Sequence, residues 1–362
     1  MKKVPIFDGH NDTLVHVYLP DRGGGRSFFK ESTKGQIDLP RAKKGGLVGG
    51  FFSIFTPPPK SSPERDPYYG FTITEQGYDV KFRSALDYGY ADDFTKSVMG
   101  FAYQLEKQSS GKVKIVHNYW ELERCVENNV LAMVLHFEGA AAISQSLSNL
   151  EDYYEKGLRS LGLVWSRPNA FGYGVPFRYP HSPNTGPGLT KAGKNLVAAC
   201  NALGIVIDLA HINGKGFWDV AKLSKDPLVV SHAGVYSLCS STRNLTDEQI
   251  DAVGNSGGVI GVIFESVNIN LKINRDGTPD NNIPLMEIVK HIDYIVNRIG
   301  VDHVALGSDF DGAGMPKELR DVSGLLNLID VLRKNGYDDD VIEKIACKNW
   351  LRVIKETWES SL

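Results

Sequence analysis

Near the start of the chain lies the stretch Val4-Pro5-Ile6-Phe7-Asp8-Gly9-His10-Asn11-Asp12, a short apolar run followed by two residues able to bind a metal ion, His10 and Asp12. Four further apolar runs end in the same way. They are residues 131–135 before Glu138, 205–207 before His211, 228–230 before His232, and 304–306 before Asp309. A barrel of parallel strands presents its catalytic groups at the C-terminal ends of several strands. The five runs together therefore favour a metal-dependent hydrolase.

Working outward from these runs, strand-like segments alternate with helical patterns along the whole chain, which is typical of βα units around a parallel sheet. We predict eight strands, the number that closes a TIM barrel. A ninth short run, 113–116, is expected outside the barrel. The predicted strands are residues 4–9, 47–55, 131–137, 160–165, 204–210, 227–231, 257–264 and 302–308. The predicted fold is α/β, a single (β/α)8 TIM barrel spanning residues 1–362.

Helix signals lie between the predicted strands. Apolar residues follow the helical period over 285–299, and Thr246-x-x-Gln249 is a capping box. We also predict helices over 191–203 and about 340–357. Two long insertions, at about 56–92 and 166–190, follow predicted strands and are expected on the active-site face. Such loops are lids or binding loops, or else plain surface insertions or dimer contacts.

The composition excludes several classes of function. The formal charge of −3 predicts no nucleic-acid partner and no anionic membrane surface. No apolar stretch approaches the roughly eighteen residues that a spanning helix needs. A proposed ligand at residue 10 leaves no room for a signal peptide, and the four cysteines are widely spaced, as in reduced thiols. We expect a cytoplasmic protein.

The metal-type residues have complementary chemistry. His10 and Asp12 are two residues apart, so in a strand both face one ion. Glu138, with two carboxylate oxygens, can bridge two ions. His211 and His232 end consecutive predicted strands and resemble ligands of a second ion. Taken singly, each of these is better explained by a turn or a core histidine.

Two more residues carry predicted roles. Asp309 could hold the attacking water and pass its proton to the leaving amine. Asp311 is close by, and we reject it because it lies further into the turn. Arg243 follows the sixth predicted strand, and its planar guanidinium matches a carboxylate. A turn acid and a surface arginine are the alternatives.

These motifs resemble the membrane (renal) dipeptidase family of binuclear zinc metallopeptidases, which have an amidohydrolase-type barrel. The motifs are Asp8-Gly9-His10-Asn11-Asp12, His136-Phe137-Glu138-Gly139, Asp208-Leu209-Ala210-His211, Ser231-His232-Ala233 and Gly307-Ser308-Asp309-Phe310-Asp311-Gly312. The resemblance implies two Zn2+ ions per chain, one bound by His10 and Asp12 and one by His211 and His232, with Glu138 and a water or hydroxide as bridges. It also implies that Asp309 is the acid/base and that Arg243 grips the terminal carboxylate of the substrate.

The chain departs from the family pattern at three places. Trp165 stands where mammalian members have a histidine that contacts the substrate. Ile263-Phe264-Glu265 replaces a common Asn-Phe-Tyr, and Gly49-Gly50-Phe51 replaces Gly-Gly-Gln. None of these positions is a predicted metal ligand. We therefore expect Trp165 and Glu265 to bind substrate and to alter specificity.

The predicted function is zinc-dependent hydrolysis of L-L and L-D dipeptides by a metal-activated hydroxide. Two alternatives stay open. One is another metal-dependent amidohydrolase acting on a lactone, a β-lactam or an N-acyl amino acid. The other is a non-enzymatic binding protein on a hydrolase scaffold. A small dipeptide is the expected partner, with no membrane, and the resemblance implies a homodimer.

Overall fold

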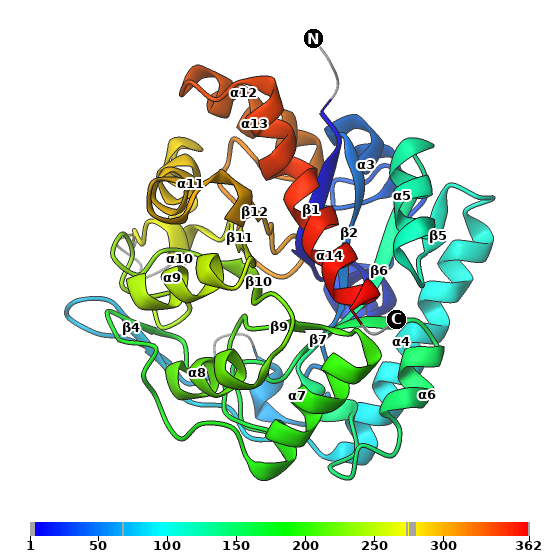
Figure 1. Cartoon of the computed structure of the whole chain (residues 1–362), viewed down its shortest axis with the longest axis vertical. Helices are drawn as coiled ribbons and strands as arrows, with labels where there is room; N and C mark the ends of the chain where they lie inside the picture. The colour runs from blue at the N-terminus through cyan, green and yellow to red at the C-terminus, as the bar shows by residue number, and fades with distance from the viewer. Residues whose placement is uncertain (1–3, 67–68, 273, 275–279, 361–362) are drawn as a thin grey trace.

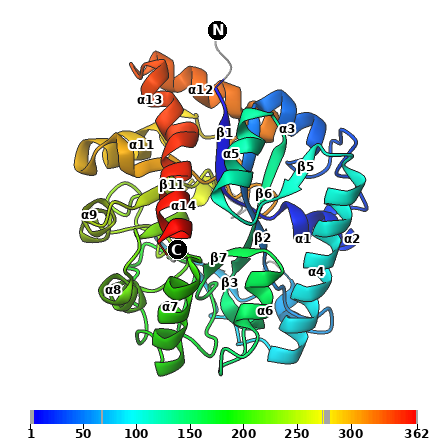
Figure 2. The same ribbon diagram turned by 45° about the vertical axis from the view of Figure 1, so that its right-hand side comes forward.

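The computed structural model describes residues 4–66, 69–272, 274 and 280–360. Eight parallel strands form a ring with helices around it, as Figures 1 and 2 show. Around the ring they are β1 (Ile6–Asn11), β2 (Leu47–Ile54), β6 (Leu131–Glu138), β7 (Leu158–Gly162), β9 (Val206–Asp208), β10 (Val229–Ala233), β11 (Val259–Val262) and β12 (Val304–Leu306). The predicted (β/α)8 barrel is confirmed.

The first and last strands of the ring meet at the ends that carry predicted site residues. The backbone N–H of Asp309 donates to the His10 carbonyl at 2.9 Å, and that of Asp12 donates to the Phe310 carbonyl at 2.8 Å. Asn11 and Phe310 form a parallel bridge. This closing seam holds two parts of the predicted site together through the main chain.

Seven of the predicted strands differ from the observed ones by at most two residues at either end. The fourth prediction, 160–165, is wrong by more, because β7 begins at Leu158 and ends at Gly162. The Leu163 carbonyl bonds to Ala140 and Asn169 in neighbouring loops, so the apolar run leaves the sheet before Trp165. The ninth run, β5 (Val113–Ile115), pairs with the edge of β6 outside the ring, as predicted.

Helices cover the outside of the ring (Figure 2). They are α1 (Thr13–Tyr18), α2 (Pro20–Gly23), α3 (Leu39–Gly45), α4 (Tyr88–Gln108), α5 (Tyr119–Glu127), α6 (Leu150–Glu155), α7 (Lys191–Leu203), α8 (Gly214–Leu223), α9 (Asp247–Asn255), α10 (Ser266–Ile269), α11 (Met286–Ile299), α12 (Leu325–Lys334), α13 (Asp339–Glu343) and α14 (Asn349–Glu359). The predicted helices α7 and α11 are confirmed, and Thr246 caps α9 with both bonds of the capping box. Within the described residues no helix is long and apolar enough to cross a bilayer.

The helix predicted over about 340–357 is confirmed, with a local irregularity inside it. A π-helical turn, η5 (Lys344–Lys348), separates α13 from α14. Directly after it, the Asn349 side chain donates to the Val304 carbonyl at 2.8 Å, and Trp350 Nε1 donates to the Leu306 carbonyl at 2.9 Å. The π-helix occurs mostly as single turns of this kind inside α-helices. The Trp350 ring packs against Phe7 in the core of the barrel.

The two insertions meet in a second, antiparallel sheet. The first supplies β3 (Phe71–Ile73) and β4 (Tyr78–Val80), and the second supplies β8 (Arg178–Tyr179). Tyr78 pairs with Tyr179, and Arg178 forms an ion pair with Asp79 at 2.8 Å. Residues 67 and 68 of the first insertion lie outside the described part of the chain. The two insertions therefore form one joint structure.

Candidate active site

A cavity of about 680 Å3 lies where the barrel strands end. Pockets of about 300–1,000 Å3 are the usual size for small ligands. Its lining includes seven of the nine residues predicted for the site, and the remaining two, His10 and His232, are fully buried beside them. The seven are Asp12, Glu138, Trp165, His211, Arg243, Glu265 and Asp309. The structure therefore brings all nine predicted residues to one place.

The Glu138 carboxylate lies at the centre of the histidine cluster. Its Oε1 is 2.9 Å from His211 Nε2, 3.6 Å from His10 Nε2 and 3.7 Å from His232 Nε2. The Nε2 atoms of His211 and His232 are 3.1 Å apart. The turn after Glu138 requires Gly139, which has a φ of 100° and no room for a Cβ beside the Trp165 backbone. One carboxylate thus reaches both predicted ligand pairs.

The donor set fits a metal site. Within the described residues, the ligand atoms of Glu138, His211 and His232 all lie within 4.8 Å of one another, and so do those of His10, Asp12 and Asp309. Both ring nitrogens of His10 are buried without a hydrogen-bond partner there. Imidazole nitrogens and carboxylate oxygens are donors that zinc prefers.

The electrostatics of the cluster also favour a cation. Burial lowers the pKa of the three histidines well below the usual range, which keeps them in the neutral form that binds metal. Burial raises the pKa of Glu138 well above its usual range, and the neighbouring carboxyls of Asp12 and Asp309 raise it further. A bound cation would offset the repulsion among these three acids.

Serine hydroxyls orient two of the histidines. Ser231 Oγ donates its proton to Asp208 Oδ2 at 2.6 Å, so it accepts from His232 Nδ1 at 2.8 Å. This arrangement leaves a lone pair on His232 Nε2, the atom that faces Glu138. Ser166 Oγ lies 2.8 Å from His211 Nδ1. Partners of this kind fix the tautomer and the direction of a metal-binding imidazole.

The two candidate aspartates have different surroundings. Asp309 and Asp311 share a left-handed backbone, with φ values of 62° and 65°, and both line the active-site cavity, so only the partners of their carboxylates distinguish them. Burial raises the pKa of the Asp309 carboxyl well above the usual range, and Glu265 and Asp12 raise it further. Strained backbone of this kind is common at functional sites.

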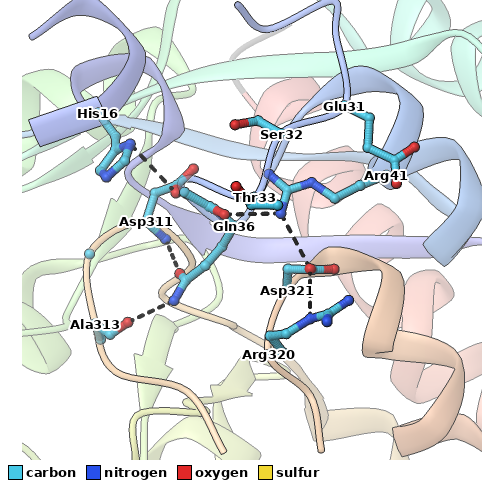
Figure 3. A pocket seen from close by; sticks show the side chains of 12 residues that line it. His16, Glu31, Ser32, Thr33, Gln36, Arg41, Asp311, Ala313, Arg320 and Asp321 are labelled. Carbon is cyan, nitrogen blue, oxygen red and sulfur yellow. Dashed lines mark hydrogen bonds and ion pairs between the residues drawn. The ribbon is translucent and has the colours of Figure 1, made fainter. Parts of the chain in front are cut away.

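The carboxylate of Asp311 is instead fully used in hydrogen bonds and an ion pair within the fold. It is fully buried and accepts from Arg26 at 2.7 Å, from Thr13 Oγ1 at 3.0 Å and from the Gln36 backbone at 2.6 Å. Figure 3 shows it beside Gln36 and His16, at the wall of a second cavity of about 600 Å3. The geometry therefore supports Asp309 as the acid/base candidate and gives Asp311 a structural role.

Arg243 is buried beside the histidine cluster. Its Nη2 donates to the His232 carbonyl at 3.1 Å, and no described carboxylate lies within 4.0 Å of its guanidinium. The preceding residue, Thr242, bonds through its backbone N–H to the Arg178 carbonyl of β8 at 3.1 Å. The joint sheet of the insertions thus holds the segment that carries Arg243.

Trp165 and Glu265 both face the cavity. The Trp165 ring lies 5.7 Å from the His211 ring and 4.8 Å from the Phe55 ring, measured between centroids. Glu265 precedes α10 and accepts a hydrogen bond from Asn268. Burial raises the pKa of its carboxyl, and Arg243 opposes that change. Both residues therefore line the cavity, and their contact with substrate stays a prediction.

Comparison with known proteins identifies the relatives of this chain. Residues 1–361 match the sequence model of the membrane dipeptidase family, peptidase family M19. The chain belongs to this family. Among M19 relatives, dipeptidase aclJ of Aspergillus oryzae is 28% identical over 365 residues, which is 98% of this chain and 78% of that protein. An uncharacterized protein from the pqqA 5′ region of Klebsiella pneumoniae is 47% identical over 256 residues, 71% of this chain and 93% of that one.

The fold also matches a solved structure of a metallo peptidase. A metallo peptidase from Rhodobacter sphaeroides, liganded with a phosphinate mimic of the dipeptide L-Ala-D-Ala, superimposes with a TM-score of 0.92 at 37% identity. The match covers 99% of this chain and 100% of that one. The predicted family and the predicted barrel are both confirmed.

Sequence reasoning missed several residues of the site. Asp208 and Ser231 stand inside quoted motifs, and a search for polar residues next to each predicted histidine would have found them. Arg167 follows Trp165 by two residues and also lines the cavity. Its environment depends on residues far away in the sequence, so no local signal marks it.

We predict that Trp165→His and Glu265→Tyr each change the relative rates across a panel of dipeptides without abolishing activity. Trp165 presents an apolar plane where mammalian family members have an imidazole, and Glu265 adds a negative charge close to Arg243. Measuring kcat/KM for the panel checks this. An unchanged ranking of substrates in both variants would show that neither side chain contacts the substrate.

Proposed function

We propose that this chain is a zinc-dependent dipeptidase that hydrolyses L-L and L-D dipeptides. The observation that carries the proposal is the convergence, in one cavity, of the cluster around Glu138 with Asp309 and Arg243. Family membership and the dipeptide mimic bound by the Rhodobacter sphaeroides relative support the same activity. When bound, zinc ions in such a cluster supply Lewis acidity and a nucleophilic water at neutral pH.

The residues of the chain would bind the metal ions, transfer a proton and bind the substrate. His10 and Asp12 would hold one zinc ion, His211 and His232 the other, with Glu138 between them. Asp309 would transfer a proton to the leaving amine. Arg243 would bind the terminal carboxylate and so set the direction in which the dipeptide enters.

A substrate panel tests the activity. Dipeptides, N-acyl amino acids and lactones are compared by kcat/KM at saturating zinc. Preference for dipeptides is the expected result. If lactones or N-acyl amino acids are hydrolysed and dipeptides are not, the dipeptidase proposal fails and the broader amidohydrolase alternative holds.

We predict two zinc ions per chain in protein purified without chelator, measured by elemental analysis. Glu138→Gln should lower the occupancy of both ions, because a neutral amide is a poor bridge between cations. Glu265→Gln is the matched control, since it removes a cavity carboxylate that is not a proposed ligand, and its zinc content should stay at two. Folded protein with no zinc before or after incubation with the metal would contradict the proposal.

We also propose a homodimer and a cytoplasmic location. The four cysteines are buried and form no disulfide, as expected in a reducing compartment. The dimer rests on the family resemblance. Sedimentation equilibrium and cell fractionation test these two points.

A further inference from the structure

Three arginines converge on one pair of aromatic rings in the wall of the cavity. The Arg167 guanidinium carbon lies 4.7 Å from the centre of the Trp165 ring and 5.6 Å from that of Phe55. Arg22 lies 5.4 Å from the Phe55 ring, and Arg83 lies 5.9 Å from the Trp165 ring. The three come from α2 and from the two insertions, and all line the cavity. We call Arg22, Arg83 and Arg167 the arginine cluster.

Arg167 is the unusual member of this cluster. It is only 3% exposed, and none of its three guanidinium nitrogens has a hydrogen-bond partner among the described residues. Burial, together with the positive charge of Arg83, lowers its pKa to about 10, although the carboxylates of Glu64 and Glu138 oppose the change. An unpaired buried charge next to a like charge is unfavourable. The cation–π contact with the Trp165 ring offsets only part of this energetic cost.

Other arginines of the chain with similar burial have partners. Arg26 pairs with Asp311 at 2.7 Å, and Arg41 pairs with Asp38 at 2.7 Å. Arg159 donates to the carbonyls of His117 and Tyr154 at 2.7 Å and 2.6 Å. In the cavity itself, Arg65 pairs with Asp21 at 2.8 Å. Glu64 and Glu138 line the same cavity, but no described carboxylate forms an ion pair or hydrogen bond with the Arg167 guanidinium.

We propose that the arginine cluster is a subsite for a second carboxylate, carried by an acidic side chain of the dipeptide. The inference rests on the proposed dipeptidase function and adds a substrate class to it. The terminal carboxylate is assigned to Arg243, so a further anionic group needs a separate cation. Trp165 lies between the arginine cluster and the histidines around Glu138, because its ring is close to both Arg167 and His211. The acidic residue can stand first or second in the dipeptide, and the experiment separates the two.

The test compares glutamate with its neutral isostere glutamine. We measure kcat/KM of the zinc-loaded enzyme for L-Ala-D-Glu, L-Ala-D-Gln, L-Glu-D-Ala, L-Gln-D-Ala and L-Ala-D-Ala. One Glu/Gln pair should show a preference for glutamate of about 10- to 150-fold, the range of a hydrogen bond to a charged group. Arg167→Gln should bring that ratio close to one while L-Ala-D-Ala is hydrolysed at nearly the wild-type rate.

Two further variants exclude a purely structural effect. Arg65→Gln removes a cavity arginine that is already paired, so the Glu/Gln ratio should not change. If Arg167→Gln does not fold, Arg83→Gln at the half-buried position should lower the same ratio. If the wild-type enzyme shows a Glu/Gln ratio of kcat/KM near one at both the first and the second residue of the dipeptide, the subsite is overturned. An equal loss on all five substrates in Arg167→Gln would also overturn it.

The failure of the subsite can be told apart from the failure of the proposed function. If L-Ala-D-Ala is hydrolysed but the ratios are near one, only the subsite is wrong. If no dipeptide is hydrolysed, calorimetry with phosphinate mimics of L-Ala-D-Glu and L-Ala-D-Gln tests the subsite without turnover. Tighter binding of the glutamate mimic, lost in Arg167→Gln, would support the subsite, and equal affinities would overturn it.

Discussion

Replacing Asp309 with asparagine should lower kcat for dipeptides by about 10²–10⁴-fold, the usual effect of losing an acid/base group. Asparagine keeps the shape of the side chain but cannot accept and return a proton. The backbone of residue 309 should stay in place, because its N–H bonds to the His10 carbonyl in the closing seam. Steady-state kinetics, with zinc content and thermal unfolding as controls, check this prediction.

The Asp311→Asn variant is the control for Asp309→Asn, and we expect it to affect stability rather than kcat. Breaking its buried pair with Arg26 should lower the free energy of unfolding by about 3–5 kcal/mol. The kcat of the folded variant should stay near the wild-type value, since the Asp311 carboxylate is occupied by Arg26, Thr13 and the Gln36 backbone. Equal losses of kcat in the two variants would show that the acid/base role has been given to the wrong carboxylate.

Removing the terminal carboxylate of the substrate should have a similarly large effect through Arg243. In a partly dehydrated cavity, the loss of one partner of such a charge pair costs roughly 2–5 kcal/mol, or about 30- to several-thousand-fold in kcat/KM. We expect a loss on this scale for a dipeptide amide with the wild-type enzyme. We expect the same loss for the free dipeptide with Arg243→Ala. Both are measured as kcat/KM.

Testing the dipeptide amide with the Arg243→Ala variant shows whether both changes remove the same interaction, the pair between the substrate carboxylate and Arg243. Arg243→Ala should reduce activity on the dipeptide amide little further, because the pair is already broken. Tripeptides should be poor substrates, since the extra residue moves the carboxylate past the arginine. Similar kcat/KM values for a dipeptide, its amide and a tripeptide extension would refute the role of Arg243 and the dipeptidase proposal with it.

The parts of the molecule that sequence could predict are those with a local signature. Each barrel strand is a short apolar run, and the residues that follow it, such as Glu138 and His232, meet because all parallel strands end on one side. Helix limits were predictable where a cap marks them, as at Thr246 and Gly204. The run that includes Trp165 misled the prediction, because apolar residues that line a cavity resemble those of a strand.

The parts that sequence could not predict depend on contacts between distant segments. The joint sheet pairs Tyr78 with Tyr179, and nothing in either insertion alone indicates its partner. Arg167 could not be singled out from sequence either. Its distinguishing feature is that its guanidinium has no hydrogen-bond partner among the described residues, and this is visible only in the folded chain. Asp309 and Asp311 could not be separated by sequence spacing, and only their surroundings distinguish them.

The closing seam has a consequence for how the protein is made. Ser308 Oγ donates to Asp8 across a sequence separation of 300 residues. β1 can pair with β2 early, but the segment that closes the ring on its other edge is made only after nearly the whole chain. Contacts this distant along the chain slow folding, and an unpaired strand edge invites association with other chains. While the ribosome is still synthesising the chain, His10 and Asp12 are already present, but Asp309 is not. The candidate active site can therefore be completed only near the end of synthesis, and a chain truncated before β12 would have neither a closed barrel nor Asp309.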